Sequence, residues 1–359
     1  MTRPARACID LRSLQHNFSR VREAAPGCQI MAIIKANAYG HGLVRVAQSL
    51  PDADAFGIVS VDEGIALREA GFDRRIILLE GLFTREDVAL VNGYRLDTVV
   101  HHDYQLQILE QAGLTRPHDV WVKLDTGMNR LGFDPADAAR LTTRLRGIGR
   151  VADIRYMTHL ACADEPDRET TRLQRERFDE ALGGLEGERS LANSAGVLAW
   201  PDTHADWVRP GIMLYGGSPL EGRSADELDL RPVMTLRTRL IAVNRRRRGE
   251  AVGYGGEWVC PEDMPVGVAA IGYGDGYPRH APSGVPVLVR GERAALIGRV
   301  SMDMICIDLR GHDGAAVGDE VVLWGEGLPV EEVAAMAGTI SYELLCGISP
   351  RVRREYLST

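Results

Sequence analysis

The chain has 359 residues, 45% of them hydrophobic and 26% charged, with a formal net charge of -8. These values exclude a disordered polar chain, indicate a globular protein with one large and one smaller domain, and disfavour a nucleic-acid partner. No run reaches the roughly 18–20 apolar residues of a membrane span. Six cysteines without C-x-x-C spacing, and an N-terminus without a signal-peptide apolar run, predict free thiols and a cytoplasmic protein.

Eight short apolar runs alternate with amphipathic stretches in the first two thirds of the chain. The runs are rich in Ile, Val and Leu without polar alternation, which is typical of strands covered on both faces. They occupy residues 29–35, 55–60, 75–80, 97–102, 119–125, 154–159, 190–194 and 206–216. The stretches 61–71 and 102–113 between them predict helices that end at glycine. We therefore expect an α/β fold with an eight-stranded β/α (TIM-like) barrel, with an open doubly wound sheet as the alternative.

The pattern changes near Leu230. Short β-branched runs punctuated by Gly, Pro and Asp follow, which predicts an all-β second domain. These runs cover residues 235–244, 265–273, 285–290, 294–300, 303–309 and 319–325. We expect residues 12–230 to form the barrel, residues 231–359 to form a mostly β domain, and residues 1–11 to supply a strand that packs on the β domain.

Polar residues stand at the carboxyl ends of the predicted barrel strands, where the active site of such a barrel lies. Lys35 ends the first run, His159 ends the sixth, and Arg209 lies on the eighth. A lysine that forms a Schiff base needs a desolvated or electropositive setting, and Arg209 on the neighbouring strand would supply that charge. The alternative for Lys35 is an exposed lysine at a strand end, and for His159 a packing histidine.

Glycines near the same ends allow close approach of a ligand to the backbone. Gly40, Gly42 and Gly211, together with Ser194 and Tyr39, would form a phosphate cradle, although each glycine alone is consistent with an ordinary turn.

A metal site is not expected. His101 and His102 are adjacent and would point to opposite faces of a strand, and the chain has no H-x-x-x-H or paired-cysteine motif to complete a site.

Ten motifs in order resemble the bacterial alanine racemases, which are pyridoxal-phosphate enzymes of fold type III. They begin with AIIKANAYGHG at residues 32–42 and continue as WVKLDTGMNRLGF, MTHLACADE, NSAGVLAW, DWVRPGIMLYG, PVMTLRTRLIAV, VGYGGEWV, GYGDGYPR, GRVSMDMICIDL and ISYELLCGISPRV. The resemblance extends almost from end to end of the chain.

The resemblance implies a role for each matching residue. Lys35 would hold pyridoxal 5'-phosphate covalently, Arg209 would bond its ring nitrogen, and His159 would lie beside the ring. Arg130 would lie near the phenolic oxygen of the cofactor and the substrate carboxylate, and the backbone of Met302 would also contact that carboxylate, with Asp303 alongside. The phosphate would be held by Tyr39, Ser194, Gly211, Ile212 and Tyr342.

The resemblance also implies a homodimer with shared sites. Tyr254 would be the second acid/base and would reach the barrel of the partner subunit. Asp164 and Tyr273 would line the entrance, where Cys162 replaces an arginine found in several relatives. Lys123 matches a position that is carbamylated in some relatives.

Racemisation requires a proton to leave one face of the substrate Cα and return to the other, so two bases, Lys35 and Tyr254, suit it. The expected function is interconversion of L- and D-alanine, for cell-wall peptidoglycan or for alanine catabolism. A racemase of another small amino acid such as serine, or of broad specificity, is the first alternative. A related decarboxylase, which has Cys in place of Tyr254, and a non-catalytic cofactor carrier are less favoured.

Overall fold

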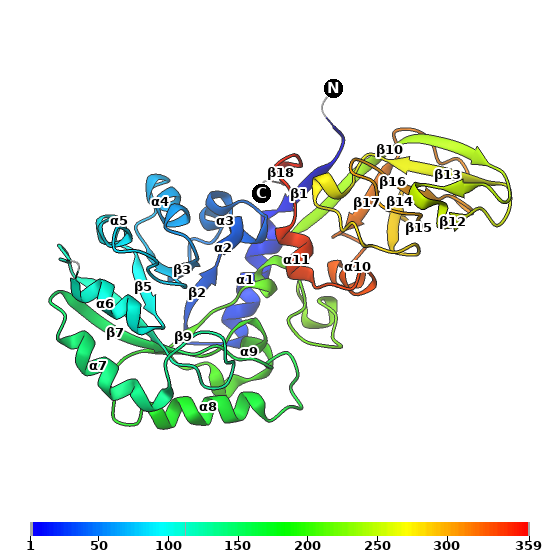
Figure 1. The fold of residues 1–359 in the computed structure, drawn as a ribbon. Coiled ribbons are helices and arrows are strands. Elements are labelled where there is room, and N and C mark those ends of the chain that lie inside the picture. The colour runs from blue at the N-terminus through cyan, green and yellow to red at the C-terminus, as the bar shows by residue number, and fades with distance from the viewer. Residues whose placement is uncertain (1–2, 112, 358–359) are drawn as a thin grey trace.

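The computed structural model describes residues 3–111 and 113–357. Within these residues, eight parallel strands close into a barrel, and a second, mainly antiparallel sheet of eight strands lies beside it (Figure 1). This arrangement confirms the predicted fold class, a β/α barrel followed by a β domain.

The barrel begins after helix α1 and closes between its first and last strands. Parallel pairing joins Gln29 to Trp207 and Ile30 to Val208, so the strand that leads to Lys35 lies beside the strand that leads to Arg209. The strands are β2 (Gln29–Ile33), β3 (Ala55–Ile58), β4 (Arg75–Leu78), β5 (Asp97–Val100), β6 (His118–Lys123), β7 (Val151–Met157), β8 (Arg189–Ser190) and β9 (Trp207–Val208). All eight predicted strands are therefore present in the predicted order.

Helices surround the barrel, and several begin at a side chain that caps free backbone amides. Ser60 and Glu63 form a reciprocal capping box at the start of α4, and Asn193 accepts from the Gly196 amide at the start of α9. The helices are α1 (Leu11–Ala24), α3 (Leu43–Ser49), α4 (Val61–Glu69), α5 (Asp87–Gly93), α6 (Asp103–Gln111), α7 (Ala138–Arg146), α8 (Thr170–Ala181) and α9 (Ser194–Ala199).

All eight predicted runs extend past the carboxyl ends of the observed strands, and three of them show how the chain turns there to build the barrel mouth. The first run is a strand only to Ile33, and Lys35 begins a separate turn, α2 (Lys35–Tyr39). Likewise, β8 ends at Ser190. The eighth run, predicted as one strand over 206–216, contains Pro210, which lacks an amide for the ladder, and continues as the 3-10 helix η3 (Ile212–Tyr215).

The β domain is organised around one long strand, β10 (Met234–Arg246). Its first half pairs with β1 and β17, and its second half pairs with β13 after a register shift between Leu240 and Ala242. This irregularity lets a single strand serve two parts of the sheet. The remaining strands are β11 (Ala251–Val252), β12 (Trp258–Val259), β13 (Met264–Ala269), β14 (Pro286–Val289), β15 (Glu292–Ile297), β16 (Ile305–Asp308) and β17 (Glu320–Trp324).

Both ends of the described chain join the β domain. Strand β1 (Arg6–Asp10) pairs with β10 on one side and with β18 (Arg353–Leu357) on the other. The domain is not purely β, since it carries helices α10 (Val330–Met336) and α11 (Ser341–Cys346). Helix α11 lies between the β domain and the barrel, where it contacts α2 (Figure 1). The C-terminal segment thus comes close to the turn that begins at Lys35.

Ion pairs connect the amino ends of several barrel strands. At the amino ends of the strands, Arg75 pairs with Asp97 and Asp119, and Arg155 pairs with Asp119 and Glu188. Because these charges are paired with one another, they are consistent with a role in stability rather than chemistry.

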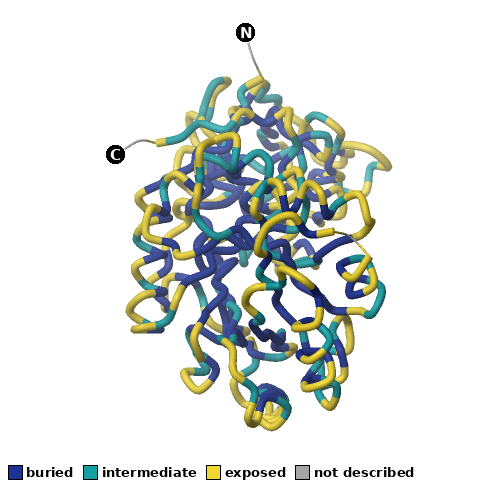
Figure 2. The backbone as a smooth tube through the Cα atoms, turned by 90° about the vertical axis from the view of Figure 1, so that its left-hand side faces the viewer, coloured by how far each residue is buried: buried dark blue, intermediate teal, exposed yellow. Residues whose placement is uncertain are grey.

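The buried stretches of the chain run through the interior, and exposed loops surround them (Figure 2). None of the described helices is long and apolar enough to cross a bilayer.

Candidate active site

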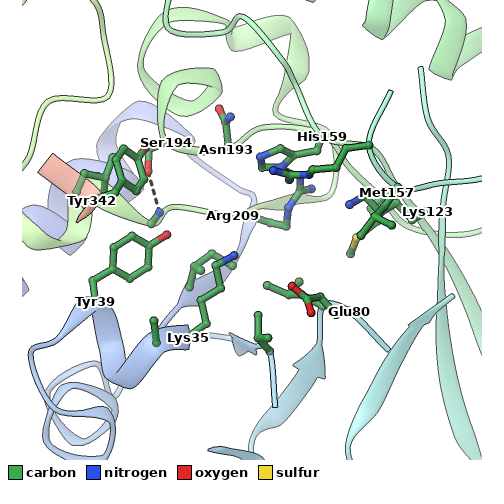
Figure 3. A pocket seen from close by; sticks show the side chains of 18 of the residues that line it. Lys35, Tyr39, Glu80, Lys123, Met157, His159, Asn193, Ser194, Arg209 and Tyr342 are labelled. Carbon is green, nitrogen blue, oxygen red and sulfur yellow. Dashed lines mark hydrogen bonds between the residues drawn. The ribbon is translucent and has the colours of Figure 1, made fainter. Parts of the chain in front are cut away.

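A cavity of about 450 Å³ opens at the carboxyl ends of the barrel strands. Figure 3 shows side chains from the ends of several strands, and from the residues that follow those strands, pointing into this one space, among them Lys35, Lys123 and Arg209. Ten residues expected in the site line the cavity together: Lys35, Tyr39, Lys123, Arg130, His159, Ser194, Arg209, Gly211, Ile212 and Tyr342. The structure thus brings nine expected residues of the barrel and Tyr342 of α11 together around one cavity.

Gly40 and Gly42, which were expected in the phosphate cradle, line no part of this cavity, and neither do five other expected residues. Tyr254, in the turn between β11 and β12, has 68% of its surface exposed, and Met302 has 52% exposed. Asp303 is ion-paired with Arg351. The other two are Tyr273, which is also exposed, and Asp164, which is close enough to Tyr342 to influence its ionisation. We call the four that belong to the C-terminal domain, Tyr254, Met302, Asp303 and Tyr273, the β-domain half of the expected site, and the residues around the cavity the barrel half.

Lys35 is followed by a rare backbone conformation. The next four residues, Ala36 to Tyr39, have φ values of 52°, 54°, 54° and 50°, so they form one left-handed turn. For L-residues such a turn costs roughly 1–2 kcal/mol per residue, and it persists only where the surroundings enforce it. Local bonds contribute, because Glu63 accepts from the Asn37 amide and the Asn37 side chain accepts from the Leu43 amide. The turn places Lys35 and Tyr39 on the same side of the cavity.

Hydroxyl groups gather on the side of the cavity next to this turn. The Ser194 hydroxyl accepts from the Gly211 amide at 2.7 Å, and the ring of Tyr39 lies 5.9 Å from that of Tyr342. A Cβ on Gly211 would lie 2.7 Å from the Tyr39 hydroxyl, so only glycine permits this approach. Burial raises the pKa of Tyr39 well above its usual value and that of Tyr342 to about 12. Both phenols therefore stay protonated and can donate to an anion.

Arg209 is held rigidly on the opposite side of the cavity. It is buried, and it donates to the Ser190 hydroxyl at 2.7 Å and to the Thr158 and Leu191 carbonyl oxygens at 2.6 and 3.1 Å. Burial lowers its pKa to about 10, so it keeps its charge at neutral pH. Its orientation is fixed before any ligand arrives.

His159 is a neutral partner of this arginine. Its Nδ1 lies 3.4 Å from Arg209 Nη2. Because an arginine nitrogen can only donate, Nδ1 is the acceptor and the proton resides on Nε2. Burial, reinforced by the charge of Arg209, lowers the pKa of His159 well below its usual value. The histidine therefore adds no further charge to the cavity.

The cavity contains both lysines of the chain. Among 42 basic residues, only Lys35 and Lys123 are lysine. Burial, together with the charges of Arg209, Arg130 and Lys35, lowers the pKa of Lys123 to about 8. An arginine effectively never loses its proton, whereas a lysine amine does and can then react as a nucleophile. Lysine thus occurs only where a reactive amine is accessible to a ligand.

Two ionisable lining residues were not predicted from the sequence. Glu80, which follows β4, is the one carboxylate among the described residues that line the cavity. It could have been found, because it ends the third apolar run just as Lys35 ends the first. Cys346, at the end of α11, also lines the cavity. No local signal identifies it, since it arrives from the β domain through tertiary packing.

Comparison with known proteins places these observations in a family. Residues 9–219 match the family model described as "Alanine racemase, N-terminal domain", and residues 233–356 match "Alanine racemase, C-terminal domain". The chain is 52% identical to an alanine racemase of Halorhodospira halophila over 99% of this chain and 98% of the relative. It is 54% identical to one of Thioalkalivibrio sulfidiphilus over 99% and 100%.

Solved structures agree with these sequence matches. The biosynthetic alanine racemase from Pseudomonas aeruginosa superimposes with a TM-score of 0.97 at 46% identity, covering 99% of this chain and 100% of that one. Alanine racemase from Acinetobacter baumannii gives a TM-score of 0.93 at 38% identity, with the same coverage. These matches confirm the resemblance inferred from the motifs. The chain therefore belongs to the alanine racemase family of isomerases.

Proposed function

We propose that the chain interconverts L- and D-alanine with pyridoxal phosphate in the barrel cavity and with two bases, Lys35 and Tyr254 of the partner subunit. The observation that carries the proposal is the convergence of a reactive amine, neutral hydroxyl donors and a rigid arginine in one cavity. Membership of the family makes alanine the expected substrate.

The cavity has the donors that pyridoxal phosphate requires. The phosphate would be held by the hydroxyls of Tyr39, Ser194 and Tyr342 and by the backbone at Gly211 and Ile212. The missing Cβ of Gly211 leaves a cradle that a larger residue would fill, as its 2.7 Å approach to the Tyr39 hydroxyl indicates. At the other side of the cavity, Arg209 would donate to the ring nitrogen, with His159 beside the ring. Lys35 would supply the amine that holds the cofactor covalently.

Each side chain then has a defined task. When bound, pyridoxal phosphate supplies the electron sink that acidifies the substrate Cα–H bond. Lys35 would take or return the proton at Cα on one face, and Arg130 would hold the substrate carboxylate. Because Arg209 is donor-only and keeps its charge, it would leave the ring nitrogen unprotonated.

The second base is proposed to come from a partner subunit. Tyr254 does not line the cavity of its own chain and is largely exposed, as is Met302. Strand β12, which follows Tyr254, lies at the far end of the β domain from the barrel (Figure 1). A homodimer in which each β domain covers the other subunit's barrel would bury these exposed residues. It would place the Met302 backbone and Asp303 near the substrate carboxylate, with Asp164 and Tyr273 at the entrance beside Cys162.

Lys123 is proposed to carry a carbamate. Its pKa of about 8 leaves part of the amine neutral near pH 7, which is the form that reacts with carbon dioxide. The modification would replace a cation by an anion among Arg209, Arg130 and Lys35, and so relieve their mutual repulsion and orient Arg130.

The proposed physiological setting is the cytoplasm, where D-alanine would be supplied for peptidoglycan or alanine would be degraded. The six cysteines are all free thiols in the described structure, which is consistent with a reducing compartment.

The test is racemisation of L-alanine by purified protein, with the cofactor trapped by borohydride and the modified peptide mapped. Because the chain has only two lysines, the map distinguishes Lys35 from Lys123 directly. We expect D-alanine and a cofactor adduct on Lys35. Protein that binds no cofactor, or that carries it on Lys123, contradicts the proposal. Faster turnover of serine than of alanine in a substrate panel would favour the alternative specificity.

A further inference from the structure

The left-handed turn after Lys35 is contacted by the last strand of the chain. Arg354 on β18 donates from Nε to the Gly40 carbonyl oxygen at 2.5 Å. Tyr356 on the same strand donates from its hydroxyl to the His41 carbonyl oxygen at 3.0 Å. We refer to Arg354 and Tyr356 as the tail clamp. They bond the two residues that directly follow the left-handed turn.

Two glycines lie where the C-terminal segment packs closely against the residues that follow the left-handed turn. A Cβ on Gly42 would lie 2.0 Å from the Tyr356 hydroxyl, and a Cβ on Gly40 would lie 2.2 Å from the Leu345 carbonyl oxygen. Both glycines also have positive φ, which other residues rarely adopt. Glycine is therefore required at positions 40 and 42 for two reasons: α11 and β18 pack closely against this segment, and its backbone has positive φ.

His41 links the tail clamp to the cavity. Its buried ring donates from Nδ1 to the carbonyl oxygens of Ala38 and Tyr39 at 3.0 and 2.8 Å, so it bonds two of the left-handed residues. The ring lies 4.6 Å from that of Tyr215, which stacks on Tyr39 at 4.7 Å. A continuous series of contacts thus runs from Tyr356 through His41 to Tyr39, whose hydroxyl faces the cavity.

We propose that Arg354 and Tyr356 are positioning residues for the cofactor, because they hold the left-handed turn that presents Lys35 and Tyr39. This inference rests on the proposed function. Without the tail clamp, Ala36 to Tyr39 lose part of what enforces their disfavoured conformation, and the backbone relaxes toward ordinary φ values. The Tyr39 hydroxyl would then move away from the position of the phosphate. The affinity for the cofactor would fall, although neither tail-clamp residue lines the cavity.

The test compares Tyr356→Phe and Arg354→Met with Arg353→Met, a neighbour on β18 whose side chain is 75% exposed. Pyridoxal phosphate is titrated into each apoprotein and followed by its absorbance. Loss of a neutral hydrogen bond should raise the dissociation constant about 5-fold, and loss of a charged one about 10- to 100-fold. Arg353→Met should stay within about 2-fold of the wild type, because it removes only an exposed charge. Arg354→Lys, which keeps a donor, should recover part of the affinity.

A second readout separates positioning from a purely structural role. At saturating pyridoxal phosphate, the tail-clamp variants should regain most of their turnover, because the residues that contact substrate are intact. Variants that melt earlier as apoproteins but bind the cofactor as tightly as the wild type would overturn the inference. If the wild type takes up no cofactor, the proposed function fails and this inference fails with it. Uptake by the wild type with equal uptake by the variants refutes the tail clamp alone.

Discussion

The two halves of the site differ in how far a single chain completes them. The barrel half is convergent and partly buried, with Arg209 fixed by three acceptors and with Lys35 lining the same cavity. The β-domain half is open, since Tyr254 and Met302 are more than half exposed and line no part of that cavity. The same chain thus presents one preorganised half-site and one set of exposed groups.

The difference follows from topology. Parallel barrel strands all end at the same rim, so residues distant in sequence meet there without help from another molecule. The strands of the β domain do not all end at one common rim. The long strand β10 leads away from the barrel, toward the turn between β11 and β12 that contains Tyr254 (Figure 1). The residues around the cavity should therefore bind the cofactor within one chain, while the β-domain half should act only in an assembly.

The largest expected effect is in the barrel half. Lys35→Arg keeps the positive charge but removes the reactive amine, so turnover should fall on the order of 10⁴-fold or more. Borohydride should then trap no cofactor at position 35, as shown by peptide mapping. Substantial retained activity in this variant would mean that another group holds the cofactor.

Tyr254→Phe should abolish the overall reaction while sparing the barrel half. We expect a loss of roughly 10²–10³-fold in L-to-D turnover, with cofactor absorbance unchanged, because only one of two bases is removed. Exchange of the Cα hydrogen with deuterated solvent should persist for one enantiomer only, since Lys35 still serves its face. Tyr94→Phe, at the end of α5, is the matched control and should behave as the wild type. Equal loss of exchange for both enantiomers would argue against two separate bases.

Gly211→Ala should weaken the phosphate cradle without touching the β domain. The added Cβ would lie 2.7 Å from the Tyr39 hydroxyl, so the tyrosine must shift. A loss of one such hydrogen bond should raise the dissociation constant for pyridoxal phosphate about 10-fold in an absorbance titration. Unchanged affinity would remove Gly211 from the cradle.

The smallest expected effect concerns Lys123. Since its pKa is lowered to about 8, the neutral amine increases as pH rises from about 7 to about 9. Incorporation of ¹³C-bicarbonate, followed by NMR, should rise over the same range and disappear in Lys123→Arg. Activity of that variant should fall only several-fold, because Arg130 stays in place. A carbamate signal that survives in Lys123→Arg would belong to another amine.

Much of the barrel half could be predicted from sequence because it follows from local pattern. Apolar runs marked all eight strands, and the polar residues at their ends marked the cavity. The exact strand ends could not be predicted, since Lys35 lies beyond the strand and directly before a left-handed turn. Of the residues Ala36 to Tyr39, only Asn37 is of a type that adopts positive φ with any frequency. The turn is enforced by Glu63, His41 and the C-terminal strand, which local sequence does not reveal.

The β-domain half could be predicted only through resemblance. Tyr254, Met302 and Asp303 lie in turns whose local sequence carries no chemical signal, and their exposure in the single chain gives none either. Glu80 could have been predicted, because it ends an apolar run just as Lys35 does. Cys346 could not, because it reaches the cavity only through the packing of α11.

The central claim, that each site combines the barrel of one subunit with Tyr254 of the partner subunit, is tested most directly by mixing two inactive variants. Lys35→Arg and Tyr254→Phe subunits are unfolded, combined in equal amounts and refolded. In a two-fold dimer with shared sites, half the dimers are mixed, and each of these has one intact site and one doubly defective site. The mixture should recover about one quarter of wild-type activity. Recovery of none, while each variant alone refolds and wild-type protein regains activity, would show that both bases come from one chain.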